Sequence, residues 1–187
     1  KREYSVKGIV FNLLEELVRR EHGEDAWDDL LDAAHVQGAY TSLGSYPDAE
    51  IARLVAAASV RLALPPADVL HWFGRQAMPL LAEKYSVFFA GHNTTHSFVL
   101  TLNSIIHPEV CKLYPGAVTP VFDFDTSTPG VLTMGYRSPR RLCALAHGFI
   151  EGAADHYGER LVYRHVRCMH QGDDQCLSHL QFEPHSH

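Results

Sequence analysis

The sequence has few cysteines and no long apolar run. Only 4 of its 187 residues are Cys, which excludes a disulfide-rich scaffold and leaves free thiols or metal ligands as the roles for these side chains. No stretch approaches the roughly 18 apolar residues that a membrane-spanning helix needs, and no signal-type apolar region follows the charged start. We therefore expect a cytoplasmic protein that contacts no membrane.

The sequence also lacks an excess of positive charge. It carries 16 Lys and Arg against 22 Asp and Glu, a net charge of −6, and no basic run suits the phosphates of a nucleic acid. We therefore expect no nucleic-acid partner. A hydrophobic fraction of 46% is ordinary for a globular chain with a real core. The residue in excess is His, with 13 copies, and imidazole is the commonest metal ligand.

Apolar residues recur at helical spacing over the first two-thirds of the chain. Prolines and polar caps mark where successive helices begin, and a loop rich in Gly, Ser and Tyr separates the second helix from the third. The expected helices cover residues 6–20, 25–35, 47–62, 65–84 and 95–114.

Beyond residue 116 the pattern changes to short runs of strand character around turn signals. The expected strands cover residues 121–124, 131–136, 161–169 and 175–182, and a helix at 139–157 separates the two hairpins. This order predicts an α+β fold, with an amino-terminal helical subdomain and a carboxyl-terminal αβ subdomain that contains a small antiparallel sheet. We expect a single domain over residues 1–187, with flexible ends at 1–5 and 183–187.

The helix expected at residue 139 begins unlike the others. The two earlier helices that begin with proline carry acidic residues in their first turn, as the helix dipole favours. Pro139 is followed instead by Arg140 and Arg141. Free backbone N–H groups and guanidinium groups would favour a bound anion there, with the hydroxyls of Tyr136 and Ser138 on the same side. The alternative is a solvated Arg pair beside an ordinary Ser N-cap.

Four candidate metal ligands lie near the carboxyl end: Cys143, His165, Cys168 and Cys176. The His and the last two Cys fall on one predicted hairpin, and the preceding helix supplies the first Cys. A closed set of three thiolates and one imidazole suits structural zinc. His147 and His170 are alternative ligands. The other interpretation is that the buried thiols act only as small apolar side chains.

His107 is a separate candidate ligand. It lies near the end of the helix expected at 95–114 and is followed directly by Pro108. The proline removes a backbone hydrogen bond and loosens that turn. Taken alone, a helical His is more often a surface residue or a satisfied core residue than a ligand.

Three features taken together resemble one family. They are the dipeptide His107-Pro108, the motif Tyr136-x-Ser138-x-Arg140, and the separation of 29 positions between His107 and Tyr136. This combination resembles the H-NOX domains, which are haem-based nitric oxide/oxygen sensors and include the haem domain of soluble guanylate cyclase. The similarity covers nearly the whole chain, beginning at residues 6–12, where Val6 stands in the place of the initiator Met.

The resemblance implies a haem b between the two subdomains. By that resemblance His107 is the proximal ligand of the iron, and Tyr136, Ser138 and Arg140 hold the haem propionates. Pro120 matches a proximal proline that helps to bend the macrocycle; the alternative for it is a plain strand-start proline. The set of three Cys and His165 resembles the zinc site of a bacterial subset of the family.

Oxygen-binding members of the family carry a distal Tyr at the position that Leu145 occupies here. Bound O2 needs a hydrogen-bond donor to be held, whereas NO bonds strongly to iron without one. We therefore expect the pocket to bind NO and CO and to exclude O2. The other side chains expected on the distal side are also apolar, although each of them suits plain core as well: Val10, Leu14, Ala77, Leu81 and Phe149.

The function implied by the resemblance is that of a cytoplasmic gas sensor without catalytic activity. NO binding would release His107 from the iron and shift one subdomain against the other. A separate histidine kinase or cyclic-di-GMP enzyme is the implied partner, because no output domain follows the last hairpin. Two alternatives remain open: a haem peroxidase or oxygenase, which would need polar distal groups, and a haem-free, zinc-containing module that binds a small molecule.

Overall fold

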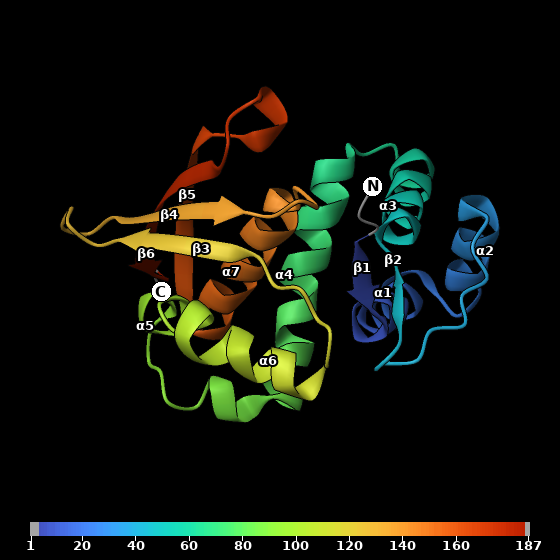
Figure 1. Ribbon diagram of the computed structural model, residues 1–187, viewed down its shortest axis with the longest axis horizontal. Coiled ribbons are helices and arrows are strands. Elements are labelled where there is room, and N and C mark those ends of the chain that lie inside the picture. Colours follow the sequence, from blue (N-terminus) through green and yellow to red (C-terminus); the bar gives the residue numbers. More distant parts are fainter. Residues whose placement is uncertain (1–3, 186–187) are drawn as a thin grey trace.

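The computed structural model describes residues 4–185 and confirms the α+β fold, with the amino-terminal helices on one side of the molecule and a four-stranded sheet, together with the helices of the second half, on the other (Figure 1). The first half contains β1 (Ser5–Lys7), α1 (Gly8–His22), α2 (Asp25–Ala34), β2 (Ser45–Pro47), α3 (Asp48–Leu62) and α4 (Pro66–Lys84). The second half contains α5 (Thr95–Val99), α6 (His107–Leu113), β3 (Val121–Asp125), β4 (Leu132–Arg137), α7 (Cys143–His156), β5 (Glu159–Arg167) and β6 (Cys176–Pro184).

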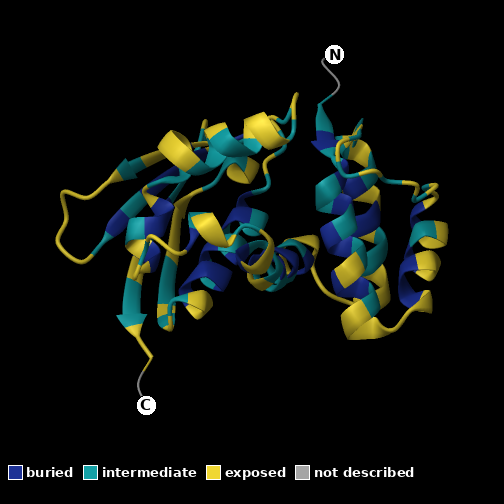
Figure 2. Cartoon of the chain, turned by 90° about the horizontal axis from the view of Figure 1, so that it is seen from below, coloured by how far each residue is buried: buried dark blue, intermediate teal, exposed yellow. Residues whose placement is uncertain are grey.

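The amino-terminal helices enclose a core of their own. α1 buries Phe11, Leu14 and Leu17 along one face, as its apolar spacing predicts. Trp27 of α2 and Leu54 of α3 belong to the same cluster. Figure 2 shows the buried residues as dark stripes along these helices, with exposed residues on their other faces.

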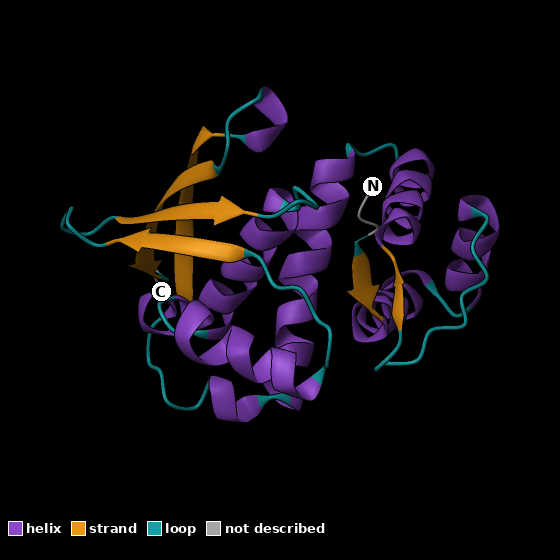
Figure 3. Cartoon of the chain, in the orientation of Figure 1, coloured by secondary structure: helices purple, strands orange, loops and turns teal. Residues whose placement is uncertain are grey.

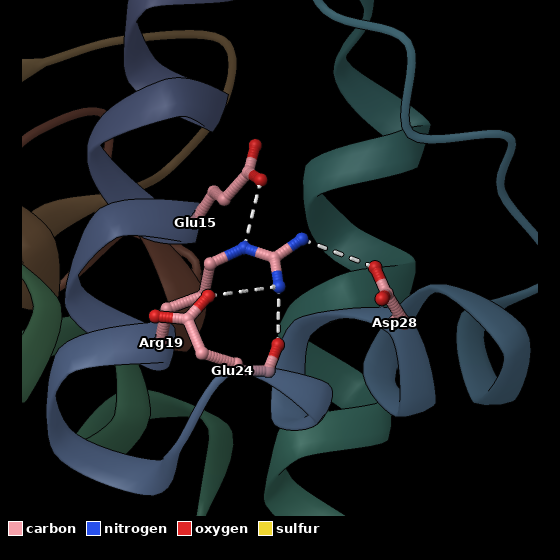
Figure 4. Close-up of polar contacts among 4 residues, drawn as sticks. All are labelled: Glu15, Arg19, Glu24 and Asp28. Carbon is pink, nitrogen blue, oxygen red and sulfur yellow. Dashed lines mark hydrogen bonds and ion pairs between the residues drawn. The ribbon is translucent and has the colours of Figure 1, made fainter.

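Arg19 connects the end of α1 to the start of α2 (Figure 4). Its Nε lies 2.9 Å from Glu15 Oε1 and its Nη2 lies 3.1 Å from Asp28 Oδ1. Its Nη1 also donates a hydrogen bond to the backbone carbonyl of Glu24. Each of these partly exposed contacts contributes little to stability by itself, and together they restrain the angle between the two helices.

The carboxyl-terminal half is built on an antiparallel sheet in the order β3-β4-β6-β5 (Figure 3). Tyr136 of β4 pairs with Phe122 of β3 on one side and with Cys176 of β6 on the other. Ile150 of α7 and Leu180 of β6 belong to the core cluster of this half. The pairing of Tyr136 with Cys176 places a residue of the candidate anion site beside a residue of the candidate zinc site.

α4 and α7 connect the two halves through a close helix crossing. A Cβ atom added to Gly74 would lie 2.4 Å from the carbonyl oxygen of Leu145, and one added to Gly148 would lie 2.1 Å from that of His71. Both distances are far below van der Waals contact, so only glycine allows these backbones to meet. The side chains around the crossing consequently face one another directly.

The single helix expected over residues 95–114 is wrong. The structure has α5, then a π-helical turn at Leu102–Ile106, then α6, which begins at His107. In the turn, the backbone N–H of Ile106 donates to the carbonyl of Thr101, five residues earlier. Pro108 has no N–H to donate and its ring crowds the preceding turn, which accounts for the irregular hydrogen bonding before it.

The helix expected to begin at residue 139 begins four residues later, at Cys143. Arg141 adopts a positive φ of 52°, which a right-handed helix cannot include, and its N–H donates to the carbonyl of Ser138. Ser138 is consequently not the helix N-cap, a position that Leu142 occupies. The two arginines lie in a tight turn before the helix rather than in its first turn.

The ends of the described chain are paired in strands. β1 pairs with β2, two strands that the sequence did not predict, and Glu183 of β6 pairs with Arg160. The remaining residues of the ends expected to be flexible, 1–3 and 186–187, lie outside the described residues. Between residues 4 and 185 no single helix has the length and apolar character to cross a membrane; only α3 and α4 taken together would, and they are bent by 105°.

Candidate functional site

His107 is the first residue of α6, and its ring is mostly buried. Its Nδ1 is buried and has no hydrogen-bond partner among residues 4–185. Burial lowers the pKa of His107 below its ordinary value of 6.5, so the imidazole is neutral at neutral pH. The ring centroid lies 5.7 Å from that of Phe122. A neutral imidazole with an unused buried nitrogen has the properties of a metal ligand.

Tyr136, Ser138 and Arg140 come together around the turn before α7. The Tyr136 hydroxyl accepts a hydrogen bond from the N–H of Leu142 at 3.1 Å, and the Ser138 hydroxyl accepts one from the N–H of Arg140 at 3.3 Å. Both side chains are buried, and burial raises the pKa of Tyr136. The motif therefore directs both hydroxyls towards one turn, as expected, although the helix starts later than expected.

Arg140 connects three segments that are distant in sequence. Its Nη1 donates to the carbonyl of Val118 at 2.8 Å, and its Nη2 donates to the carbonyl of Ser5 in β1. Its Nε is buried and has no partner within the described chain. A buried guanidinium nitrogen without an acceptor is costly, so the site suits an anionic group such as a carboxylate.

Pro120 lies directly before β3 and two residues before Phe122, whose ring neighbours His107. It is partly buried. It therefore lies at the start of the strand that carries Phe122.

The six apolar residues expected on the distal side fall in one hydrophobic cluster, to which α1, α4 and α7 contribute: Val10, Leu14, Ala77, Leu81, Leu145 and Phe149. Two tyrosines also pack against this cluster, but their hydroxyls are used elsewhere. Tyr40 donates to Glu50 Oε2 at 2.6 Å, and the hydroxyl of Tyr46 accepts from the N–H of Thr41 at 2.7 Å. The structure thus brings together the residues that the sequence assigned to an apolar pocket.

The thiol-rich set also converges. One ligand atom from each of Cys143, His165, Cys168 and Cys176 lies within 4.8 Å of all the others. A β-bulge between His165 and Arg167 shifts the alternation of side chains by one residue, which lets His165 and Cys168 face the same side. The backbone N–H of Met169 donates to the Cys176 sulfur at 3.3 Å.

The electrostatics of this set favour a cation. Burial and the neighbouring Cys176 raise the pKa of Cys143 to about 12, and burial raises the pKa of Cys176 as well. Three thiolates would repel one another in this space without a positive charge between them. Three sulfurs and one imidazole in a compact group are the donor set that zinc prefers.

The two alternative ligands lie elsewhere. His170 Nε2 is 2.7 Å from the carbonyl oxygen of Arg141, and the His147 ring stacks on Tyr163 at 3.6 Å. Burial, and secondarily the neighbouring His71, lower the pKa of His147 to about 4. The sequence did not predict that His147 groups with His71 and Glu151, although the four-residue spacing of His147 and Glu151 on one helix is a signal for two of the three members.

Fold and site together define a domain with a helical half and a sheet-containing half, whose buried imidazole and guanidinium suit a metal-centred, anionic group. A family described as haem-NO-binding matches residues 7–165. The chain therefore belongs to the haem-NO-binding, or H-NOX, family of haem-binding gas-sensor domains. The buried, unpartnered nitrogens of His107 and Arg140 fit this group, because haem offers an iron to an imidazole and carboxylates to a guanidinium.

Solved structures agree with this assignment. The crystal structure of an H-NOX protein from Shewanella oneidensis in the Fe(II)NO state is 32% identical, with a TM-score of 0.89 over 95% of this chain and 99% of that one. The solution structure of an H-NOX domain from the same organism in the Fe(II)CO state is 32% identical, with a TM-score of 0.86 and the same coverage. An unliganded Fe(II) H-NOX protein from K. algicida, 22% identical, shares the fold over 97% of this chain and 99% of its own, with a TM-score of 0.86.

Proposed function

We propose that the protein senses NO and CO at a ferrous haem b and excludes O2. The observation that carries this proposal is the apolar cluster of α1, α4 and α7, which includes Leu145. By resemblance, Leu145 matches the position of the distal Tyr in oxygen-binding members of the family. The relatives solved in the Fe(II)NO and Fe(II)CO states support binding of these two gases.

The residues that would hold the haem are His107, as the ligand of the iron, and Tyr136, Ser138 and Arg140, which would bind its carboxylates. By resemblance, Pro120 would help to bend the macrocycle. Haem supplies a ferrous iron that binds a diatomic gas. His107 supplies a neutral imidazole, and burial keeps it neutral. Arg140 supplies a fixed positive charge and a free donor at Nε.

The proposed selectivity against O2 follows from the lack of a hydrogen-bond donor among the side chains expected on the distal side. Leu145 and Phe149 on α7 and Leu81 on α4 offer no hydrogen-bond donor, and Tyr40 and Tyr46 direct their hydroxyls to Glu50 and Thr41. Bound O2 draws negative charge onto its outer atom and depends on such a donor, whereas NO and CO depend on it far less. The pocket therefore favours NO and CO.

The signal would begin at His107. The π-helical turn before it and Pro108 after it leave this segment with fewer regular hydrogen bonds than an unbroken helix. Arg140 is bonded to Ser5 of the helical half and to Val118 of the other half, so movement at the site is passed to both. A partner that distinguishes the two states needs a coupling of about 1–3 kcal/mol.

The partner that we propose is a histidine kinase or a cyclic-di-GMP enzyme on a separate chain, and the sensor itself has no catalytic role. Four free thiols suit a reducing cytoplasm, where we place both proteins. Zinc, held by Cys143, His165, Cys168 and Cys176, would fasten the β5–β6 hairpin to the start of α7.

The test is the absorption spectrum of the ferrous protein in air and then with NO. We expect no oxy complex in air and a spectral change with NO that reports loss of the His107 bond. A stable oxy complex would contradict the selectivity. Peroxide turnover at enzymatic rates, or no Soret band after expression with haem supply, would contradict the sensor itself.

A further inference from the structure

A second group of metal-ligand side chains lies at the crossing of α4 and α7. His71 comes from α4, and His147 and Glu151 come from α7, one helical turn apart. The glycine contact between Gly148 and the backbone of His71 removes the usual separation of two helices at this point. The imidazole of α4 therefore lies directly over the imidazole and the carboxylate of α7.

The three side chains converge on a common space. One ligand atom from each lies within 4.8 Å of the other two, and the rings of His71 and His147 are 4.4 Å apart at an angle of 60°. His71 Nε2 is only 2.5 Å from Glu151 Oε2, yet this buried nitrogen makes no hydrogen bond with any described residue. The two atoms are therefore close together without the alignment that a hydrogen bond requires, which leaves the ring nitrogen without a donor or acceptor partner there.

The surrounding contacts hold these ligands in place. Arg75 lies 3.2 Å from the other carboxylate oxygen, Glu151 Oε1, so Oε2 is the oxygen that faces the imidazoles. Arg75 is itself held by Asp155, with Nε 2.7 Å and Nη2 3.1 Å from its two oxygens. Tyr163 stacks on the His147 ring at 3.6 Å and 9°. Such outer contacts orient the ligands of a metal site before the metal binds.

We propose that His71, His147 and Glu151 form a second metal site, separate from the thiol-rich set, that binds a divalent cation such as Zn²⁺, Ni²⁺ or Co²⁺ and cross-links α4 to α7. Two imidazoles and one carboxylate suit these borderline cations and leave coordination positions for water. The positive charge of Arg75 weakens the site electrostatically, and its paired contacts with Asp155 offset part of this effect.

The experiment uses the haem-loaded, zinc-loaded protein and Ni²⁺ as the probe, in equilibrium dialysis and thermal unfolding. We expect the wild type to bind one more equivalent of Ni²⁺ than His71→Ala or Glu151→Gln. In each variant the affinity of the site for Ni²⁺ should fall by roughly tenfold or more. The unfolding temperature should rise with Ni²⁺ in the wild type only. Glu151→Gln preserves the size of the side chain, so its loss of binding does not depend on a change of fold.

The matched control is His156→Ala, which removes an exposed imidazole from the end of the same helix. It should bind Ni²⁺ like the wild type. The histidines near the carboxyl end are common to every variant, so any Ni²⁺ that they bind does not affect the comparison. Cys168→Ser should keep the Ni²⁺ equivalent, since the two sites are separate. Equal Ni²⁺ binding in His71→Ala and the wild type, or loss of that equivalent in Cys168→Ser, would overturn the proposal, and neither result depends on gas binding.

Discussion

The side-chain amide of Asn103 pairs with the backbone of Phe122 as one strand pairs with another. Asn103 Nδ2 donates to the carbonyl oxygen of Phe122 at 2.5 Å, and Asn103 Oδ1 accepts from its N–H at 3.3 Å. Asn103 lies in the π-helical turn directly before His107, and Phe122 is the residue whose ring neighbours His107. This amide thus attaches the His-bearing segment to the edge of the sheet.

Replacing Asn103 by Ala should therefore destabilise the protein and loosen His107. Both backbone groups of Phe122 would lose their partner, at a cost of about 1–3 kcal/mol in the free energy of unfolding, measurable by urea titration. Haem should also dissociate faster. Ser104→Ala, an exposed change in the same turn, is the control and should alter neither quantity. Wild-type stability in Asn103→Ala would show that the pairing is incidental.

Replacing His107 by Ala should remove the side chain that we propose as the ligand of the iron. We expect the ferrous Soret band to shift and haem retention to fall, with added imidazole restoring the spectrum by taking the vacated space. His96→Ala on α5 changes an exposed imidazole and serves as the control. An unchanged spectrum in His107→Ala would remove this residue from the site.

Introducing a donor as Leu145→Tyr should permit some O2 binding, because the hydroxyl would enter the apolar cluster of α1, α4 and α7. The measurement is the spectrum of the ferrous protein in air. Leu145→Phe adds a similar ring without the hydroxyl, so it separates hydrogen bonding from size. If the Phe variant formed the oxy complex as readily as the Tyr variant, the donor argument would be wrong.

Metal analysis should find zinc that depends on the thiol-rich set. Cys168→Ser should lose it, whereas Cys111→Ser, which changes an exposed thiol outside the set, should not. Because burial holds the pKa of Cys143 at about 12, zinc binding at neutral pH must displace thiol protons. Acidification of a weakly buffered solution on adding zinc measures this release. Zinc retained in Cys168→Ser would exclude Cys168 as a ligand.

His147 should make stability depend on pH. Its pKa is about 4 in the folded protein, against an ordinary value of 6.5, so the unfolded chain binds more protons between these values. The free energy of unfolding should consequently fall as pH is lowered from 7.5 to 5.5. His147→Phe retains an aromatic ring against Tyr163 and should reduce this slope. His107 and His165, whose pKa values are also lowered by burial, should contribute to the slope in the same direction.

Local patterns predicted most of the secondary structure. The helices α2, α3 and α4 and the four strands of the main sheet lie within a few residues of their expected bounds, because apolar spacing and proline positions act over one or two turns. The break in the helix before His107 and the late start of α7 were missed. The first depends on the backbone N–H that Pro108 lacks, and the second on the Tyr136 hydroxyl that accepts from the N–H of Leu142; helical periodicity encodes neither.

The sequence by itself determined the class of this protein: the spacing of His107, Tyr136, Ser138 and Arg140 resembles a known haem-binding family, and the spacing of three Cys and one His predicted their convergence. The tertiary structure alone decided which distant groups meet. Arg140 reaches Ser5 across most of the chain, and His71 meets Glu151 only because glycines let α4 and α7 approach. Spacing along a chain reports on neighbours within one element, whereas contacts between elements depend on the angle and distance at which packed helices and sheets cross.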